Sequence, residues 1–260
     1  MAGMTQRLGT GLMDFIAAAG QQLFLAFDVL RSLFRYRLRW ALLAQQIQFI
    51  GTQSILVVVI TGAFTGAVFA AQIQFQFADL GMNSAVGPVV SLAMCRELGA
   101  VLCALMVAGR VGSAMAAELS TMKITEQIDA LRALAVYPTE YLLVPRVLGM
   151  AIAMPVLTAL CIFFGIAAGY FVFTTILGLD GAYYWENTLY FTKAKDVLIG
   201  LIKGLFFGII IAVVSCHKGM TSGGGAAGVG VATTQAVVNA SLLILITNFF
   251  FTFLLNTLFS

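Results

Sequence analysis

The sequence predicts an all-α membrane protein with an N-terminal interfacial amphipathic helix followed by five transmembrane helices. Of its 260 residues, 61% are hydrophobic and only 10% are charged, whereas soluble domains carry about 25% charged residues. Mean hydropathy is +1.00. Residues 40–78, 147–179 and 219–260 contain no charge, and each stretch exceeds the roughly 20 residues that cross a hydrocarbon core. These observations exclude a soluble globular protein.

Residues 1–45 are predicted to form the interfacial helix. Apolar side chains recur there at spacings of three or four, while three arginines follow another line of the same helix. Such a helix can lie in the membrane plane with its arginines among the headgroups. The alternative is an ordinary helix packed on the rest of the protein. The apolar residues are Leu12, Phe15, Ile16, Ala19, Leu23, Phe27, Leu30 and Phe34, and the arginines are Arg31, Arg35 and Arg39.

Residues 46–260 are predicted to form one transmembrane domain whose spans lie close together. Gly62 and Gly66, like Gly165 and Gly169, are separated by three residues, a spacing that lets two helices approach closely. The motif is weak on its own in a glycine-rich chain. The five spans are expected at about 46–72, 85–117, 141–174, 197–216 and 236–258.

Basic residues predict the orientation of the spans. Five arginines precede the first span, and Lys123, Arg132 and Arg146 lie in or near the segment after the second. The segments on the opposite side have no such excess of basic residues. The positive-inside rule therefore places the N-terminus in the cytoplasm and, after five crossings, the C-terminus outside. The net charge of +3 is too small to indicate a nucleic-acid partner.

The sequence offers no cofactor site of its own. Cys95, Cys103, Cys161 and Cys216 lie in or beside apolar segments without metal-ligand spacing, so they are predicted to be small buried hydrophobes. The glycine-rich stretch 219–230 lacks the lysine and the preceding strand of a nucleotide-binding loop. Any ATP chemistry must therefore come from another chain.

Two charged residues fall about a dozen residues inside the second span. An ionised side chain there costs about 2.5 kcal/mol or more, so Arg96 and Glu97 need partners. Neighbours on a helix point about 100° apart and cannot neutralise each other face to face. Lys203, at comparable depth in the fourth span, is predicted to pair with Glu97, leaving Arg96 available to a cavity. The alternative is that the pair only pins two helices together.

Residues 118–140 form the most polar stretch, on the predicted cytoplasmic side. A short helix is expected at about 120–135, with Ser120 or Thr121 as its N-cap and Pro138 ending the segment. The helix could insert into a groove of a partner protein or be a solvated turn between spans, and the pattern alone favours neither. Its apolar stripe comprises Leu119, Ile124, Ile128 and Leu131.

Five motifs follow one another along the chain: Arg96-Glu97-Leu98-Gly99, the run Ala108 to Glu118, the run Met122 to Leu131, Val144-Pro145-Arg146 and the run Gly228 to Val238. Together they resemble the MlaE/YrbE permease family, and the resemblance extends from about residue 46 to the end of the chain. Family members often have proline after Arg-Glu-Leu-Gly, but Ala100 stands here, so the second span is expected to be less kinked.

The resemblance implies the permease subunit of an ATP-driven ABC transporter in the bacterial inner membrane. Such a subunit moves phospholipids between that membrane and periplasmic MCE-domain proteins, which maintains outer-membrane lipid asymmetry. It works as a homodimer with two cytoplasmic ATPase subunits, which bind ATP and Mg²⁺. The chain itself is then not an enzyme and carries no cofactor, and its C-terminus is periplasmic.

The resemblance also implies functional positions. Glu126, Gln127 and Asp129 match the family's coupling helix, which sits in the ATPase. Arg96 and Glu97 match positions beside a lipid cavity at the dimer interface, together with Phe69, Gln76 and Leu80. Arg96 suits a lipid phosphate, whereas Phe69 and Leu80 supply apolar wall or else face bulk lipid.

Two other functions compete with this interpretation. A secondary transporter of a small solute normally shows inverted repeats, and five spans do not divide evenly into such repeats. A non-transporting membrane scaffold would dock partners through residues 118–140. The scaffold predicts that Arg96 and Glu97 tolerate apolar substitution.

Overall fold

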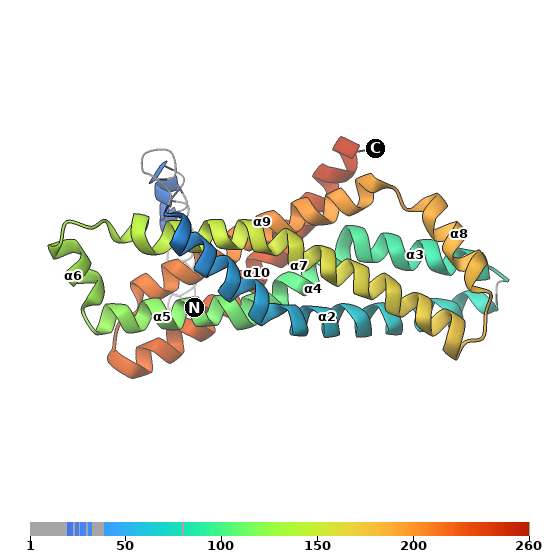
Figure 1. Cartoon of the computed structure of the whole chain (residues 1–260), viewed down its shortest axis with the longest axis horizontal. Helices are drawn as coiled ribbons and strands as arrows, with labels where there is room; N and C mark the ends of the chain where they lie inside the picture. Colours follow the sequence, from blue (N-terminus) through green and yellow to red (C-terminus); the bar gives the residue numbers. More distant parts are fainter. Residues whose placement is uncertain are drawn as a thin grey trace, which may run out of the picture.

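The computed structural model describes residues 20–32 except 23, 26 and 30, residues 39–79 and residues 81–259. Within these residues the chain contains helices and turns but no strand. Five helical segments are long and apolar enough to cross a membrane, which confirms the predicted all-α fold with five candidate spans. They run along the long axis of the molecule (Figure 1). The segments are Trp40–Ala78, Val86–Ile124, Thr139–Ile176, Ala194–Thr221 and Gly225–Leu258.

Several of these segments are divided into shorter elements. The first is the single helix α2 (Trp40–Ala78), and the last two are α9 (Ala194–Thr221) and α10 (Gly225–Phe259). Short helices α6 (Gln127–Ala133) and α8 (Gly181–Phe191) lie at opposite ends of the molecule, here termed the α6 end and the α8 end (Figure 1). The second segment comprises α3 (Val86–Ala93), α4 (Gly99–Val107) and α5 (Ser113–Ile124), and the third comprises α7 (Val144–Phe171) flanked by π-helical turns at Thr139–Leu143 and Val172–Ile176.

The last helix begins earlier than the sequence indicated. The fifth span was expected from about residue 236, but α10 starts at Gly225. The connection from α9 is a tight turn in which Gly224 and Gly225 have φ values of +83° and +67°. Glycine adopts these left-handed conformations without steric strain. The glycine-rich stretch 219–230 is therefore mostly helical: residues 219–221 end α9 and residues 225–230 begin α10.

The predicted interfacial helix lies mainly outside the described residues. Among its described positions, residues 20–22, 24–25, 27–29 and 31–32 are helical. Val29 is buried in the main hydrophobic core, whereas Phe24 and Phe27 are exposed. This part therefore packs on the bundle through one face and leaves apolar side chains on another. Its position in the membrane plane stays a prediction.

Helices α2 and α7 approach each other through their glycines. A Cβ atom added to Gly66 would lie 2.0 Å from the carbonyl oxygen of Gly165, and one added to Gly62 would lie 2.5 Å from that of Cys161. Real Cβ atoms cannot approach this closely, so only glycine fits at both positions. The spaced glycines of the first and third spans therefore form one helix–helix contact, as their motif indicated.

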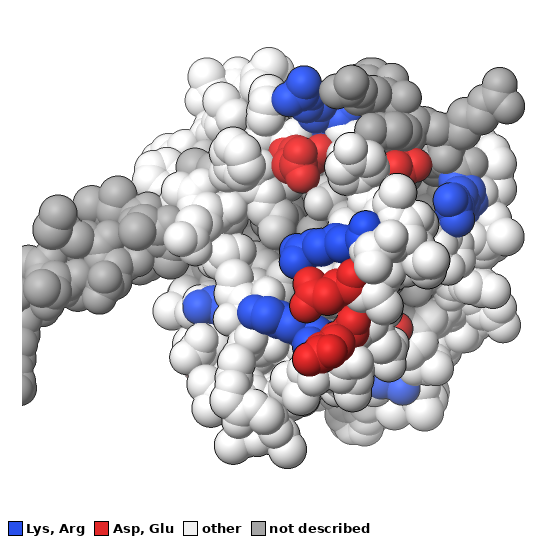
Figure 2. Space-filling view, turned by 90° about the vertical axis from the view of Figure 1, so that its left-hand side faces the viewer, with Lys and Arg blue, Asp and Glu red and all other residues white. Residues whose placement is uncertain are grey.

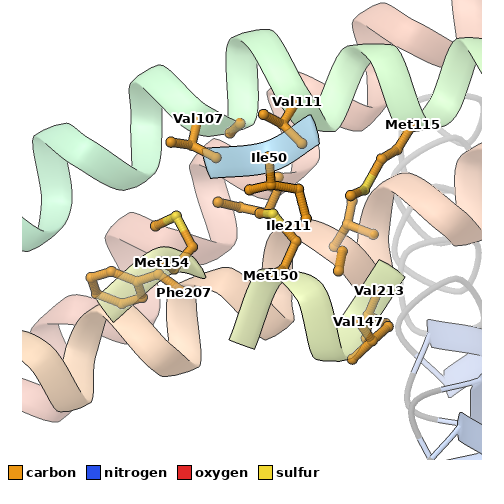
Figure 3. Packing of buried hydrophobic residues seen from close by; sticks show 14 of the residues in the cluster. Ile50, Val107, Val111, Met115, Val147, Met150, Met154, Phe207, Ile211 and Val213 are labelled. Atoms are coloured by element: carbon orange, nitrogen blue, oxygen red, sulfur yellow. The ribbon is translucent and has the colours of Figure 1, made fainter. Parts of the chain in front are cut away.

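Most of the buried apolar residues form one cluster between α2, α4, α5, α7 and α9. Ile50 of α2 lies in it beside Met150 and Met154 of α7 and Ile211 of α9 (Figure 3). A smaller cluster at the α8 end includes Tyr184 of α8, packed on residues of α2 and α3. Burial raises the pKa of the Tyr184 hydroxyl, so this side chain stays neutral.

The second span departs from regular α-helix at two π-helical turns, Met94–Leu98 and Ala108–Gly112. Each π turn widens the helix locally. Ala100, which stands in place of the family proline, is fully buried in α4 just after the first turn. The irregularity of the second span thus arises without proline and falls on the residues that include Arg96 and Glu97. That Ala100 leaves this span less kinked than in relatives with proline stays a prediction.

The polar segment between the second and third spans also differs from its prediction. Helix α5 continues to Ile124, so Ser120 and Thr121 lie inside it and do not cap a new helix. The chain then breaks at Glu126, whose φ is +59°, and α6 begins at Gln127. The short helix is therefore half the expected length, because a left-handed residue interrupts a stretch that has helical periodicity throughout.

Candidate functional site

The side chains of Glu97 and Lys203 lie together, as the sequence analysis proposed. Lys203 Nζ is 2.7 Å from Glu97 Oε1. The lysine side chain is fully buried, while 35% of the glutamate side chain is exposed. Thr252 Oγ1 of α10 lies 2.9 Å from both Lys203 Nζ and Glu97 Oε1. The ion pair and its hydrogen bonds to Thr252 thus link the second, fourth and fifth spans.

The last helix contributes a row of polar side chains that the sequence analysis missed. Asn248, Thr252 and Asn256 are spaced by four residues and so lie on one face of α10. Asn248 Nδ2 donates to Glu97 Oε2 at 3.1 Å, and Asn256 Oδ1 accepts from Arg96 Nη1 at 3.1 Å. The spacing of these residues within an otherwise apolar span was the signal that could have identified them.

Arg96 has an acidic partner that the sequence analysis did not predict. Its Nε and Nη2 atoms lie 2.7 and 2.6 Å from Asp196 Oδ1. Asp196 also accepts a hydrogen bond from the backbone N–H of Lys193 at 2.8 Å, which fixes the carboxylate at the start of α9. Asp196 precedes Lys203 by seven residues, two helical turns, and so lies on the same helix face. That spacing could have predicted its role.

Three of these four charged groups line a cavity of about 250 Å³, and Asp196 lies behind Arg96 as its partner. Arg96, Glu97 and Lys203 line it directly, together with Thr252 and Asn256 of the polar row. The cavity therefore lies between the second, fourth and fifth spans. The apolar part of its wall comes from Leu92, Ala93, Ile199 and Leu255.

A separate apolar groove of about 490 Å³ runs along the exposed face of α2. Phe69 lines it, as does Leu98, the residue after Glu97. The groove and the charged cavity therefore lie on different faces of the second span near Arg96–Leu98. Gln76 is exposed further along α2 and does not line either hollow. Leu80, the last predicted lipid-site residue, lies outside the described residues.

The α6 end carries exposed charges of both signs (Figure 2). The side chains of Glu126, Gln127 and Asp129 are all exposed there, and Asp129 forms an ion pair of 2.8 Å with Arg132. Ile128 points the other way and is buried in the main core. Helix α6 therefore presents a polar face while its apolar face holds it on the bundle.

A buried arginine supports this end of the molecule from within. Arg146 at the start of α7 pairs with Glu118 of α5 at 2.8 Å and donates to the carbonyl of Leu142 at 2.7 Å. Its side chain is almost fully buried. The pair links the second and third spans at the α6 end of the molecule, six residues before α5 ends at Ile124.

Metal-ligating side chains do not gather in the part of the chain that the structure describes. No group of three or more His, Cys, Asp or Glu residues there could hold an ion. The four cysteines are buried and not joined in disulfides, and Cys103, Cys161 and Cys216 lie in the main hydrophobic core. In the described part of the chain, the charged cavity, the apolar groove on α2 and the polar face of α6 are the candidate sites for interaction.

Comparison with known proteins gives consistent matches. The family model described as "Permease MlaE" matches residues 43–254. A probable ABC transporter permease protein of Rickettsia conorii is 43% identical over 94% of this chain and 95% of its own length. One from Synechocystis is 42% identical over 81% of this chain and 80% of its own length. The Arabidopsis chloroplast protein TRIGALACTOSYLDIACYLGLYCEROL 1 is 37% identical, covering 86% of this chain and 64% of that protein.

Proposed function

The chain belongs to the MlaE permease family, and from this premise we propose that it is the membrane subunit of an ATP-driven phospholipid transporter. It exchanges phospholipids between the bacterial inner membrane and periplasmic MCE-domain carriers and so maintains outer-membrane lipid asymmetry. The observation that carries the proposal is the cavity lined by Arg96, Glu97 and Lys203 in an otherwise apolar bundle. Ionisable residues at such depth are costly and usually mark a transport pathway.

The chemistry of the two hollows fits an amphiphilic cargo. A phospholipid has two apolar chains and a charged headgroup, so it needs apolar wall next to a few polar groups. The charged cavity supplies the polar groups, and the groove lined by Phe69 and Leu98 supplies apolar wall. The name of the Arabidopsis relative contains a diacylglycerol lipid, which supports a lipid rather than a small solute.

We propose a homodimer as the working unit. In the single chain, the outer half of α10 exposes Phe249, Phe250 and Phe253, which together form an apolar surface. A second copy of the chain could cover this surface while leaving the cavity beside it accessible. The relatives named as ABC transporter permeases support two separate ATPase subunits that bind ATP and Mg²⁺ below the membrane.

The α6 end is proposed to face the cytoplasm and to receive the ATPase, with the N-terminus inside and the C-terminus in the periplasm. Excess arginines near the first span favour this orientation. Glu126, Gln127 and Asp129 lie exposed on and beside α6, where a partner protein can reach them. Closure of the paired ATPases would move α6 and, through the ion pair between Arg146 and Glu118, the second and third spans.

Reversing the charge of Glu126 tests the coupling role. We expect Glu126→Lys to weaken association with the ATPase at least about tenfold, because reversing a charge at the proposed docking surface disrupts its electrostatic complementarity with the partner. ATP-dependent lipid transfer should fall with it. Co-purification of the ATPase and transfer in proteoliposomes measure both. Glu186→Lys on exposed α8, at the opposite end of the molecule (Figure 1), is the matched control and should change neither. Normal assembly and transfer with Glu126→Lys would contradict the coupling role.

Substituting Arg96 tests the transport site itself. The Arg96→Leu, Asp196→Asn double variant removes one cation and one anion, so no buried charge is left unpaired. We expect it to fold but to reduce ATP-dependent phospholipid transfer by about tenfold or more, equivalent to about 1.4 kcal/mol. Transfer between reconstituted vesicles measures this. Unchanged transfer would favour the scaffold, which needs no charge in the cavity.

A further inference from the structure

The two charged groups that open into the cavity have opposite signs. The side chains of Arg96 and Glu97 are 34% and 35% exposed, whereas those of their partners Asp196 and Lys203 are 1% and 0% exposed. A molecule entering the cavity therefore meets one guanidinium and one carboxylate side by side. The buried partners hold these groups in place.

The charges around the cavity also balance. Arg96 with Asp196 and Lys203 with Glu97 make two ion pairs, so the set carries no net charge. A ligand with net negative charge would bring an uncompensated charge into surroundings of low dielectric constant, where isolated charges are strongly disfavoured. A zwitterionic ligand adds no net charge and avoids this penalty.

Both exposed groups retain hydrogen-bonding capacity. A guanidinium has five N–H donors, and the contacts of Arg96 to Asp196 and Asn256 use three of them. A carboxylate offers about four acceptor positions, and Glu97 accepts from Lys203, Thr252 and Asn248. Arg96 can therefore still donate to a phosphate, and Glu97 can still accept from an ammonium N–H.

We propose that this cavity selects phospholipids with a zwitterionic headgroup, binding the phosphate at Arg96 and the ammonium at Glu97, over phospholipids with a net anionic headgroup. A primary ammonium such as that of phosphatidylethanolamine fits best, because it provides N–H donors for Glu97. The inference rests on the proposed phospholipid transport and specifies its substrate class.

Lipid competition in nanodiscs tests the selectivity of the unaltered transporter. The complete complex is reconstituted with equal amounts of phosphatidylethanolamine and phosphatidylglycerol, then repurified in detergent, and the retained lipid is measured by mass spectrometry. We expect phosphatidylethanolamine to be enriched about fivefold over its share of the bilayer. N-acetylated phosphatidylethanolamine keeps the phosphate but loses the ammonium, and it should lose this enrichment. Equal retention of the three lipids, or enrichment of the anionic ones, would overturn the inference.

Two variants of equal net charge then locate the ammonium site. Glu97→Gln and Asp196→Asn each leave the four-residue set with one excess positive charge. Of these two acidic residues, Glu97 lines the cavity and Asp196 does not. Glu97→Gln therefore also removes the ammonium acceptor, whereas Asp196→Asn leaves it in place. We expect phosphatidylglycerol retention to rise in both variants, and phosphatidylethanolamine retention to fall about fivefold further in Glu97→Gln. Equal retention of phosphatidylethanolamine in both variants would contradict its assignment to Glu97.

Failure of this inference is distinguishable from failure of the proposed function. Lipid that co-purifies in the proportions of the bilayer, with ATP-dependent transfer intact, rejects headgroup selection and leaves transport standing. A complex that retains no phospholipid and transfers none rejects both. Glu97→Asp keeps the charge, and retention of the wild-type lipid ratio by this variant would support the electrostatic basis of the selection.

Discussion

Replacing Lys203 with methionine is expected to destabilise the protein by about 3 kcal/mol, the low end of the effect of removing one member of a buried ion pair, because the Glu97 side chain left behind is 35% exposed. Lys203 is fully buried and contacts Glu97 and Thr252. Without the lysine ammonium, the Glu97 carboxylate loses its cationic partner. Its remaining hydrogen bonds to neutral side chains of α10 do not balance the negative charge. Thermal unfolding in detergent, followed by the loss of monodisperse protein, measures the effect.

Two double variants separate charge from packing. Glu97→Gln combined with Lys203→Met removes both charges, so it should recover most of the stability while transport stays low. The exchange Glu97→Lys with Lys203→Glu keeps one charge of each sign and should rescue at least part of the loss of each single variant. If Lys203→Met melts like the wild type, or if the exchange rescues neither single variant, the ion pair does not hold these spans together.

Replacing Gly66 with leucine is expected to prevent correct packing of the first and third spans. Its Cβ would meet the backbone carbonyl of Gly165 at 2.0 Å, and that carbonyl cannot move without shifting α7. Overpacking of flexible side chains costs about 1–3 kcal/mol, and here rigid backbone must separate, so the cost should exceed that range. We expect little monodisperse protein on size-exclusion chromatography.

Gly51 provides the matched control on the same helix. A Cβ at Gly51 would meet nothing within 4 Å, so Gly51→Leu should give a normal yield and melting temperature. It makes the same chemical change in α2 and tests helix propensity without the close contact. Equal yields of Gly51→Leu and Gly66→Leu would show that the α2–α7 contact is not required.

The sequence predicted the features that follow from two rules: spans in lipid need apolar side chains, and a charge inside the membrane needs a partner. Long uncharged stretches predicted five spans, and the cost of an unpaired charge led from Glu97 to Lys203. Asp196 was missed because it lies just before residue 197, where the fourth span was predicted to start. Its hydrogen bond to the Lys193 backbone shows that it belongs to the first turn of α9.

The hydrophobic pattern of the sequence did not predict the irregularities of the backbone. The π turn at Met94–Leu98 contains neither glycine nor proline, so neither residue type marked its position. The break at Glu126 is similar, because a non-glycine residue adopts a left-handed conformation there. Both depend on how neighbouring helices pack, which one-dimensional periodicity does not contain. The role of Gln76, which is exposed on α2, likewise depends on the proposed second copy of the chain, which the pattern of one chain does not contain.

The wide turn at Met94–Leu98 has a consequence for how this span tolerates change in length. An α-helical position contributes about 100° of rotation, and a π turn accommodates one residue beyond the regular winding. Deleting a single residue there would allow regular α-helical winding. The deletion would either rotate Arg96 and Glu97 away from α9 and α10 or displace the rest of the second span. Point replacements nearby should thus be far less harmful than shortening, and natural relatives lacking that residue should have lost both salt bridges together.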